Sequence, residues 1–171
     1  RQTARHRHRR GITCNASAAS GTRLPRRGRA PEMDTIDIAR RCGDVMYAKD
    51  AASKALGIRV EIPAAGEASA SMTVRDDMVN GFDVCHGGLL FTLADTAFAF
   101  ACNAYDNQTF AAAASIEFIR PVLLGDELRA LAREDYRGSK RGLYTVEVRN
   151  QHDEVVALFH GRSASRGERL L

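Results

Sequence analysis

Tryptophan is absent from the sequence, and cysteine and proline occur only four times each. The cysteines, at Cys14, Cys42, Cys85 and Cys102, form no CxxC pair and have no histidines at zinc-like intervals. This scatter argues against a disulfide framework or a metal site and favours free thiols in a reducing compartment. We therefore expect a cytoplasmic protein that holds no metal.

Long hydrophobic runs are also lacking. The apolar run Leu89–Cys102 is too short to cross a bilayer and carries Asp95 near its middle. The basic start of the sequence is not followed by the apolar stretch that a secretory signal requires. The sequence thus predicts no association with a membrane.

The net charge of +4 is distributed unevenly along the sequence. Residues 1–32 hold nine arginines and one acidic residue, a net charge of +8, so sixteen basic and twenty acidic residues give the remainder −4. Residues 1–32 show no hydrophobic period, and we expect a disordered basic leader that is not part of the fold. A transit peptide or a basic arm for an anionic partner are the alternatives. The mildly acidic remainder gives no reason to expect nucleic-acid binding.

Regular patterns begin at Met33, and we expect one domain over residues 33–165. A helix apolar on every side must be wrapped by a sheet, so the prediction is an α+β fold, a curved antiparallel β-sheet around one long central helix. The expected elements are a helix over 36–56 stopped by Gly57, strands 58–62 and 68–74, a loop over 76–86, the long helix from Gly87 to about 104, and strands 111–120, 128–136, 143–148 and 155–160.

Asp95 is the first candidate for chemistry because it lies within the apolar helix. No lysine or arginine occurs between His86 and Arg120, which excludes an ion pair local in sequence. Burying an unpaired carboxylate is unfavourable, and buried acids with perturbed pKa values concentrate at functional sites. The alternative is that Asp95 is merely tolerated, bonded to hydroxyls or to a backbone amide.

Gly87 and Gly88 at the start of the same helix are the second candidate. A helix N-terminus presents free N–H groups and positive dipole, and glycine allows close approach of a ligand, which together form an oxyanion hole. Eight residues separate Gly87 from Asp95, or about 12 Å along a helix, too far for one carbonyl carbon to use both. If both groups act, two antiparallel copies of the helix must share each site, which predicts a homodimer.

Several motifs resemble the hot-dog thioesterases of phenylacetic acid degradation. The likeness covers about Met33 to Gly161, and the 1–32 extension has no counterpart in it. The HGG-x₄-LAD spacing is the specific part. The matching segments are Asn80-Gly81, Cys85-His86-Gly87-Gly88, Leu93-Ala94-Asp95-Thr96-Ala97-Phe98-Ala99, Ile119-Arg120-Pro121, Gly125-Asp126 and Val156-Ala157-Leu158-Phe159-His160-Gly161.

The resemblance implies a hot-dog fold and hydrolysis of phenylacetyl-CoA or its ring-hydroxylated forms. Asp95 would act as general base or nucleophile, Asn80 would hold the water, the Gly87 amide would be the oxyanion donor, and His86 would orient the thioester or the loop. It further implies no cofactor, since coenzyme A is part of the substrate, and a homotetramer built as a dimer of dimers.

Basic residues in loops are candidates for the CoA phosphates. Arg120, Lys140 and Arg141 follow predicted strands, with Gly88 as a further contact at the helix start; a solvated basic rim is the alternative. Two other functions stay open. A hot-dog hydratase or dehydratase would carry a differently spaced histidine motif with a nearby proline, and none occurs between Pro63 and Pro121. A noncatalytic acyl-CoA-binding regulatory protein would gain from an apolar residue at position 95.

Overall fold

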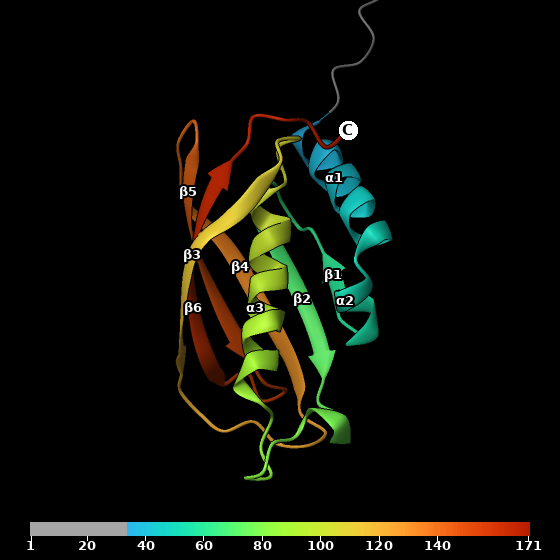
Figure 1. Cartoon of the computed structure of the whole chain (residues 1–171), viewed down its shortest axis with the longest axis vertical. Helices are drawn as coiled ribbons and strands as arrows, with labels where there is room; N and C mark the ends of the chain where they lie inside the picture. The colour runs from blue at the N-terminus through green and yellow to red at the C-terminus, as the bar shows by residue number, and fades with distance from the viewer. Residues whose placement is uncertain (1–33) are drawn as a thin grey trace, which may run out of the picture. The chain divides into compact units, whose positions relative to one another are not determined.

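The computed structural model of the chain describes residues 34–171, so the predicted leader over 1–32 lies outside the described residues. Figure 1 shows the order of the elements. They are α1 (Thr35–Lys49), α2 (Ala51–Ala55), β1 (Arg59–Glu61), β2 (Glu67–Thr73), the short 3₁₀ helix η1 (Asp76–Met78), α3 (Gly87–Cys102), β3 (Thr109–Phe118), β4 (Glu127–Arg137), β5 (Arg141–Arg149) and β6 (Val155–Ser165).

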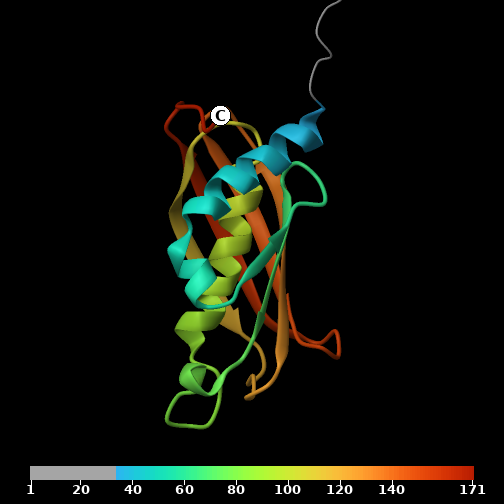
Figure 2. The ribbon, with the colours of Figure 1, turned by 90° about the vertical axis from the view of Figure 1, so that its right-hand side faces the viewer.

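The six strands form one antiparallel sheet in the order β1-β2-β4-β5-β6-β3. The helix α3 packs against β2, β3, β4, β5 and β6, so the sheet curls around it (Figures 1 and 2). This arrangement confirms the predicted fold class. The strand β6 runs five residues past its predicted end at His160, because its ladder with β3 continues to the pair Thr109 and Ser165.

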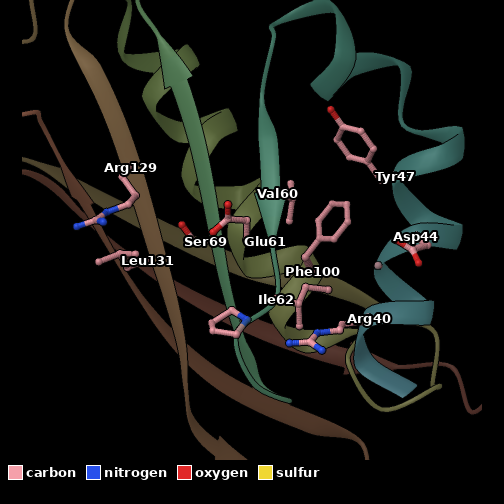
Figure 3. A pocket seen from close by; sticks show the side chains of 12 residues that line it. Arg40, Asp44, Tyr47, Val60, Glu61, Ile62, Ser69, Phe100, Arg129 and Leu131 are labelled. Atoms are coloured by element: carbon pink, nitrogen blue, oxygen red, sulfur yellow. The ribbon is translucent and has the colours of Figure 1, made fainter. Parts of the chain in front are cut away.

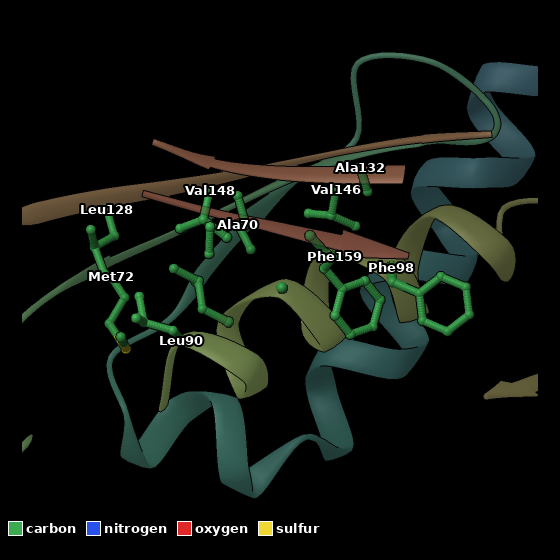
Figure 4. Packing of buried hydrophobic residues seen from close by; sticks show 14 of the residues in the cluster. Ala70, Met72, Leu90, Phe98, Leu128, Ala132, Val146, Val148 and Phe159 are labelled. Carbon is green, nitrogen blue, oxygen red and sulfur yellow. The ribbon is translucent and has the colours of Figure 1, made fainter. Parts of the chain in front are cut away.

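The core lies between α3 and the concave face of the sheet (Figure 4). Burial alternates along β2 and β4, as expected for strands with one covered face. Small side chains such as Ala70 and Ala130, which are paired across these strands, let the helix approach closely. Phe98, in the C-terminal half of α3, lies against Gly161, where an added Cβ would come within 2.7 Å of the Phe98 ring. Glycine is therefore required at position 161 by packing.

The single helix expected over 36–56 is wrong, because the chain breaks it into α1 and α2 at Asp50. The Asp50 carboxylate accepts hydrogen bonds from the Ser53 N–H (2.9 Å) and the Ser53 hydroxyl (2.6 Å), and so caps α2. Gly57 ends the segment with a φ of +69°, as its position predicts. The Ser53 Oγ also lies 3.4 Å from the Thr96 Oγ1, which connects α2 to α3.

The expectation that α3 is covered on every side is also wrong. Gly88 is exposed, and Thr92, Asp95 and Ala99 are half-buried; their spacing of four, three and four residues places them on one stripe of the helix. The neighbouring strand β3 is a sheet edge with largely apolar, exposed residues. Within the described chain, both surfaces lack a covering partner. None of the helices in residues 34–171 is long and apolar enough to span a membrane.

Candidate active site

The loop before α3 is fixed by its own backbone and by Asn80. The Asn80 Oδ1 accepts from the Phe82 N–H (2.8 Å), and the Asn80 N–H donates to the Val84 carbonyl (2.8 Å). The Asn80 Nδ2 amide makes no hydrogen bond within residues 34–171. The loop thus uses the oxygen of this side chain and leaves its N–H groups available to a water or substrate.

His86 is the N-cap of α3, and its Nδ1 accepts from the Gly88 N–H at 3.0 Å. A neutral ring in this arrangement carries its proton on Nε2. Gly88 is a predicted contact for coenzyme A, but its N–H is already bonded to His86. The Gly87 N–H, by contrast, has no acceptor among the described residues and keeps the free donor that an oxyanion requires.

A cavity of about 360 Å³ opens at this end of α3 and brings together Asn80, Gly87 and Arg120. The Phe118 ring covers Gly87 so closely that an added Cβ would lie 3.0 Å from its Cζ. The remaining walls are apolar and come from the loop, from α3 and from the segment after β3. The other lining residues are Val84, Cys85, Leu90, Ile119, Pro121 and Val122.

Asp95 lies half-buried on α3 and makes no hydrogen bond or ion pair within the described chain. Burial raises the pKa of its carboxyl group. The polar side chains nearest to Asp95 along the helix are hydrogen-bonded to other groups, so they do not compensate the burial of its carboxylate. These bonds join the Thr92 hydroxyl to the Gly88 carbonyl (2.8 Å), the Thr96 Oγ1 to the Ser53 Oγ (3.4 Å), and the Asn103 Nδ2 to the carbonyls of Ala99 and Thr109 (both 2.9 Å).

The Asp95 carboxylate faces a second cavity of about 590 Å³. Its walls come from α1, from the C-terminal half of α3, from the start of β3 and from the segment after β6. Most of them are apolar, and no histidine is among the described residues that line it. The lining residues besides Asp95 are Met46, Phe98, Ala99, Cys102, Asn103, Gln108, Thr109, Phe110, Ala111 and Leu170.

The predicted residues thus fall into separate groups along α3. Lys140 and Arg141 line a small cavity of about 110 Å³ that shares Cys102 and Thr109 with the Asp95 cavity. Arg120 lies at the other end of the helix with Gly87. One chain therefore places the carboxylate and two basic residues at one end, and the free N–H and one basic residue at the other.

A further cavity, of about 630 Å³, contains none of the predicted site residues (Figure 3). It lies between α1, β1, β2 and β4, over Phe100, and charges of both signs surround it. Within residues 34–171 no cluster of histidine, cysteine and acidic residues could hold a metal ion. The cysteines Cys42, Cys85 and Cys102 are buried and free.

Met46, Phe110 and Leu170 line the Asp95 cavity but were not identified from the sequence. They come from α1, from the start of β3 and from the segment after β6, so no local spacing in the sequence connects them to Asp95. Phe110 gives a weak signal as an aromatic residue on an edge strand. The other two resemble ordinary core residues in the sequence.

Comparisons with known proteins identify the family. Residues 82–157 match the family described as Thioesterase superfamily. The acyl-coenzyme A thioesterase PaaI of Escherichia coli is 48% identical over 118 residues, which cover 69% of this chain and 84% of that protein.

Solved structures agree with the sequence comparison. The Escherichia coli PaaI structure, from the phenylacetic acid degradation operon, has a TM-score of 0.78 at 43% identity and covers 80% of this chain and 99% of that one. A mutant structure of the Thermus thermophilus PaaI protein has a TM-score of 0.63 at 35% identity and covers 66% of this chain and 96% of that one. The chain has the hot-dog fold and belongs to the thioesterase superfamily, in the PaaI branch.

Proposed function

We propose that this protein is an acyl-CoA thioesterase that hydrolyses phenylacetyl-CoA or ring-hydroxylated phenylacetyl-CoA to the free acid and coenzyme A, in phenylacetate catabolism. The observation that carries the proposal is the Asp95 carboxylate. It is half-buried, has a raised pKa and has no partner in the described chain. An unpaired carboxylate in apolar surroundings destabilises the fold, and activation of a nucleophile would account for its presence.

Each site is formed by two copies of the chain. The open stripe of α3, defined by Gly88, Thr92, Asp95 and Ala99, consists of small or polar residues that allow a second helix to approach. The free edge of β3 can extend the sheet into a second copy. Two α3 helices packed antiparallel along this stripe bring the partner's Gly87 towards Asp95. Within one chain Gly87 and Asp95 lie about 12 Å apart and cannot act on the same carbonyl group.

The same arrangement explains the scattered basic residues. An antiparallel partner helix places its N-terminal end, with its Arg120, beside the end of this chain that carries Lys140 and Arg141. Three cations then surround the entrance of one site, where they can bind the phosphates of coenzyme A. Gly88, whose N–H is bonded to His86, adds only its open backbone surface.

The reaction begins when water, held by the Asn80 Nδ2 amide of the partner, attacks the thioester carbonyl carbon. The Asp95 carboxylate takes the proton of the water, and the carbonyl oxygen becomes an oxyanion that accepts from the partner's Gly87 N–H. Collapse of the intermediate breaks the C–S bond and releases the coenzyme A thiolate, which is then protonated. The chemistry requires no cofactor.

Asp95 can also act as the nucleophile, in which case its oxygen forms an anhydride that water then cleaves. Both routes require the ionised carboxylate. A single turnover in heavy-oxygen water tests the second route, because label enters Asp95 when water cleaves the anhydride at the Asp95 carbonyl carbon, whereas direct attack of water puts all of the label into the released acid.

The remaining predictions follow from the same chemistry. The apolar walls of the Asp95 cavity suit an aryl or other apolar acyl group. A hydratase would carry a differently spaced histidine motif with a nearby proline, and the sequence has no proline between Pro63 and Pro121. Location in the cytoplasm and a homotetramer built from two such dimers stay predictions.

The test replaces the carboxylate and keeps its shape. Asp95→Asn should lower the rate of thiol release from phenylacetyl-CoA by about 10²–10⁴-fold, the range typical of a general base, with the dimer intact by ultracentrifugation. Asp44→Asn is the matched control, because Asp44 is an exposed aspartate on a helix and lines the 630 Å³ cavity. An Asp95→Asn enzyme at wild-type rate, or a loss confined to Asp44→Asn, would overturn the assignment.

A further inference from the structure

The segment that follows β6 is paired with the turn between α3 and β3. The Arg166 N–H donates to the Gln108 carbonyl (2.9 Å), and the Gln108 N–H donates to the Glu168 carbonyl (2.7 Å). These two bonds use both backbone groups of Gln108. Residues 166–171 therefore have a defined position beside α3 and β3.

Asp106 holds the end of this segment in place. Its Oδ1 accepts from the N–H groups of Leu170 (2.9 Å) and Leu171 (2.8 Å), and its Oδ2 accepts from the Arg169 Nε (2.6 Å). The Leu171 N–H, more than any other group, lowers the pKa of Asp106. The Asp106 backbone has a φ of +51°, a left-handed conformation that aspartate tolerates better than most residues. Three charge-assisted hydrogen bonds thus converge on one carboxylate.

The position that Asp106 fixes is a wall of the cavity that contains Asp95. Leu170 lines this cavity. The same segment contacts a second wall, since the Arg166 guanidinium lies over the Phe110 ring with 4.9 Å between its Cζ and the ring centroid. Segments that end a domain usually fray unless they are tied down, and this one is tied at the cavity.

We propose that Leu170 is a specificity-determining residue of the acyl-binding cavity, and that Asp106 is the positioning residue that holds it there. The inference rests on the proposed thioesterase function. Leu170 limits the room available to the apolar acyl group whose thioester carbon lies at Asp95. Neither residue takes part in the bond-breaking step, so changes at either alter which acyl groups are accepted more than how fast the best one reacts.

The experiment measures kcat/KM for acetyl-CoA, phenylacetyl-CoA and phenylbutyryl-CoA with wild type and variants. Leu170→Ala deepens the cavity and should raise the ratio of kcat/KM for phenylbutyryl-CoA to kcat/KM for phenylacetyl-CoA by about tenfold or more. An effect of this size is typical of small volume changes in an apolar pocket. Leu170→Phe fills the cavity and should lower phenylacetyl-CoA hydrolysis while leaving acetyl-CoA near wild type. Leu171→Ala is the matched control, because that side chain does not line the cavity.

The positioning role is tested with Asp106→Asn, which keeps the shape and the left-handed backbone but removes the charge. It should raise KM for phenylacetyl-CoA, with little change in kcat, and shift the acyl preference towards phenylbutyryl-CoA, as Leu170→Ala does. A general loss of structure would instead lower kcat for all three substrates, so the split between KM and kcat distinguishes the two.

The outcomes also separate this inference from the function on which it rests. Wild-type activity with equal acyl preference in the Leu170 and Leu171 variants would overturn the role of Leu170 and leave the thioesterase assignment intact. A wild-type protein that releases no thiol from any of the three substrates would overturn both.

Discussion

The Gly87 N–H can be removed with little change to the helix that carries it. Gly87 is the first residue of α3, the position at which proline is best tolerated because its missing N–H has no partner within the helix. The preceding residue, His86, has a φ of −62° and a ψ of 127°, in the extended region that proline imposes on its neighbour. Gly87→Pro therefore deletes the proposed oxyanion donor and retains the start of α3.

The size of the effect follows from the role of that donor. Removal of one oxyanion-hole N–H lowers kcat by about 10²–10³-fold, or about 2.7–4 kcal/mol of transition-state stabilisation. The new ring also meets Phe118, because a Cβ at this position lies 3.0 Å from its Cζ. Phe118 is 56% exposed and can move aside, so steric conflict contributes little.

Gly87→Ala is the matched control, since it introduces the same Cβ and keeps the N–H. Steady-state thiol release from phenylacetyl-CoA should show a large loss of kcat in the proline variant and at most a few-fold loss in the alanine variant. Circular dichroism and sedimentation check the helix content and the dimer. Equal activities in the two variants would refute the assignment of the Gly87 N–H as oxyanion donor, and equally large losses would assign the effect to Phe118.

Three further predictions rest on the same geometry. Mixing Asp95→Asn with Gly87→Pro chains should restore about one quarter of wild-type thiol release, since about half of the dimers are mixed and each has one intact site; no recovery after verified subunit exchange contradicts a shared site. Because burial raises the pKa of Asp95, ionisation of its carboxyl group destabilises the fold as pH rises through that pKa. Asp95→Asn should therefore have a higher free energy of unfolding in urea than wild type at neutral pH, and the difference should disappear near the ordinary aspartate pKa of about 3.9. The same raised pKa places the acid limb of the wild-type pH–rate profile above that ordinary value. Phe159→Ala, at a fully buried position beside Phe98, should lower the urea-unfolding free energy by about 3–5 kcal/mol, and a loss under 1 kcal/mol would contradict the packing described.

Most elements could be predicted because their signals are local. Alternating burial along β2 and β4 repeats the alternation in the sequence, and the apolar run after Gly87 matches α3 to within two residues. The break between α1 and α2 also has a local signal, since Asp50 is a good N-cap three residues before the Ser53 amide that it accepts from. A single helix was predicted there because the apolar spacing continues through the break.

The walls of the Asp95 cavity could not be predicted in this way. Leu170 and Asp106 are sixty-four residues apart and meet only because β6 and β3 are neighbours at the sheet edge. The Leu170 backbone N–H donates to the Asp106 carboxylate, and almost any residue type at position 170 would supply this N–H. The identity of residue 170 therefore does not indicate the contact. Sequence spacing identifies Gly87 and Asp95, the proposed reacting groups, because they share one helix, and it misses the residues that shape the cavity.

The error about α3 has a different cause, and it bears on the site itself. The apolar composition of a helix indicates how much of it is buried in the functional oligomer, but it does not indicate which chain covers it. The sheet of one chain covers most of α3 and leaves the stripe at Gly88, Thr92, Asp95 and Ala99 open beside the bare edge of β3. The exposed residues of β3 beside this stripe are largely apolar, and a contiguous apolar surface in water is unfavourable. The sequence predicts more cover for α3 than one chain supplies, which favours a second copy at the face that carries Asp95.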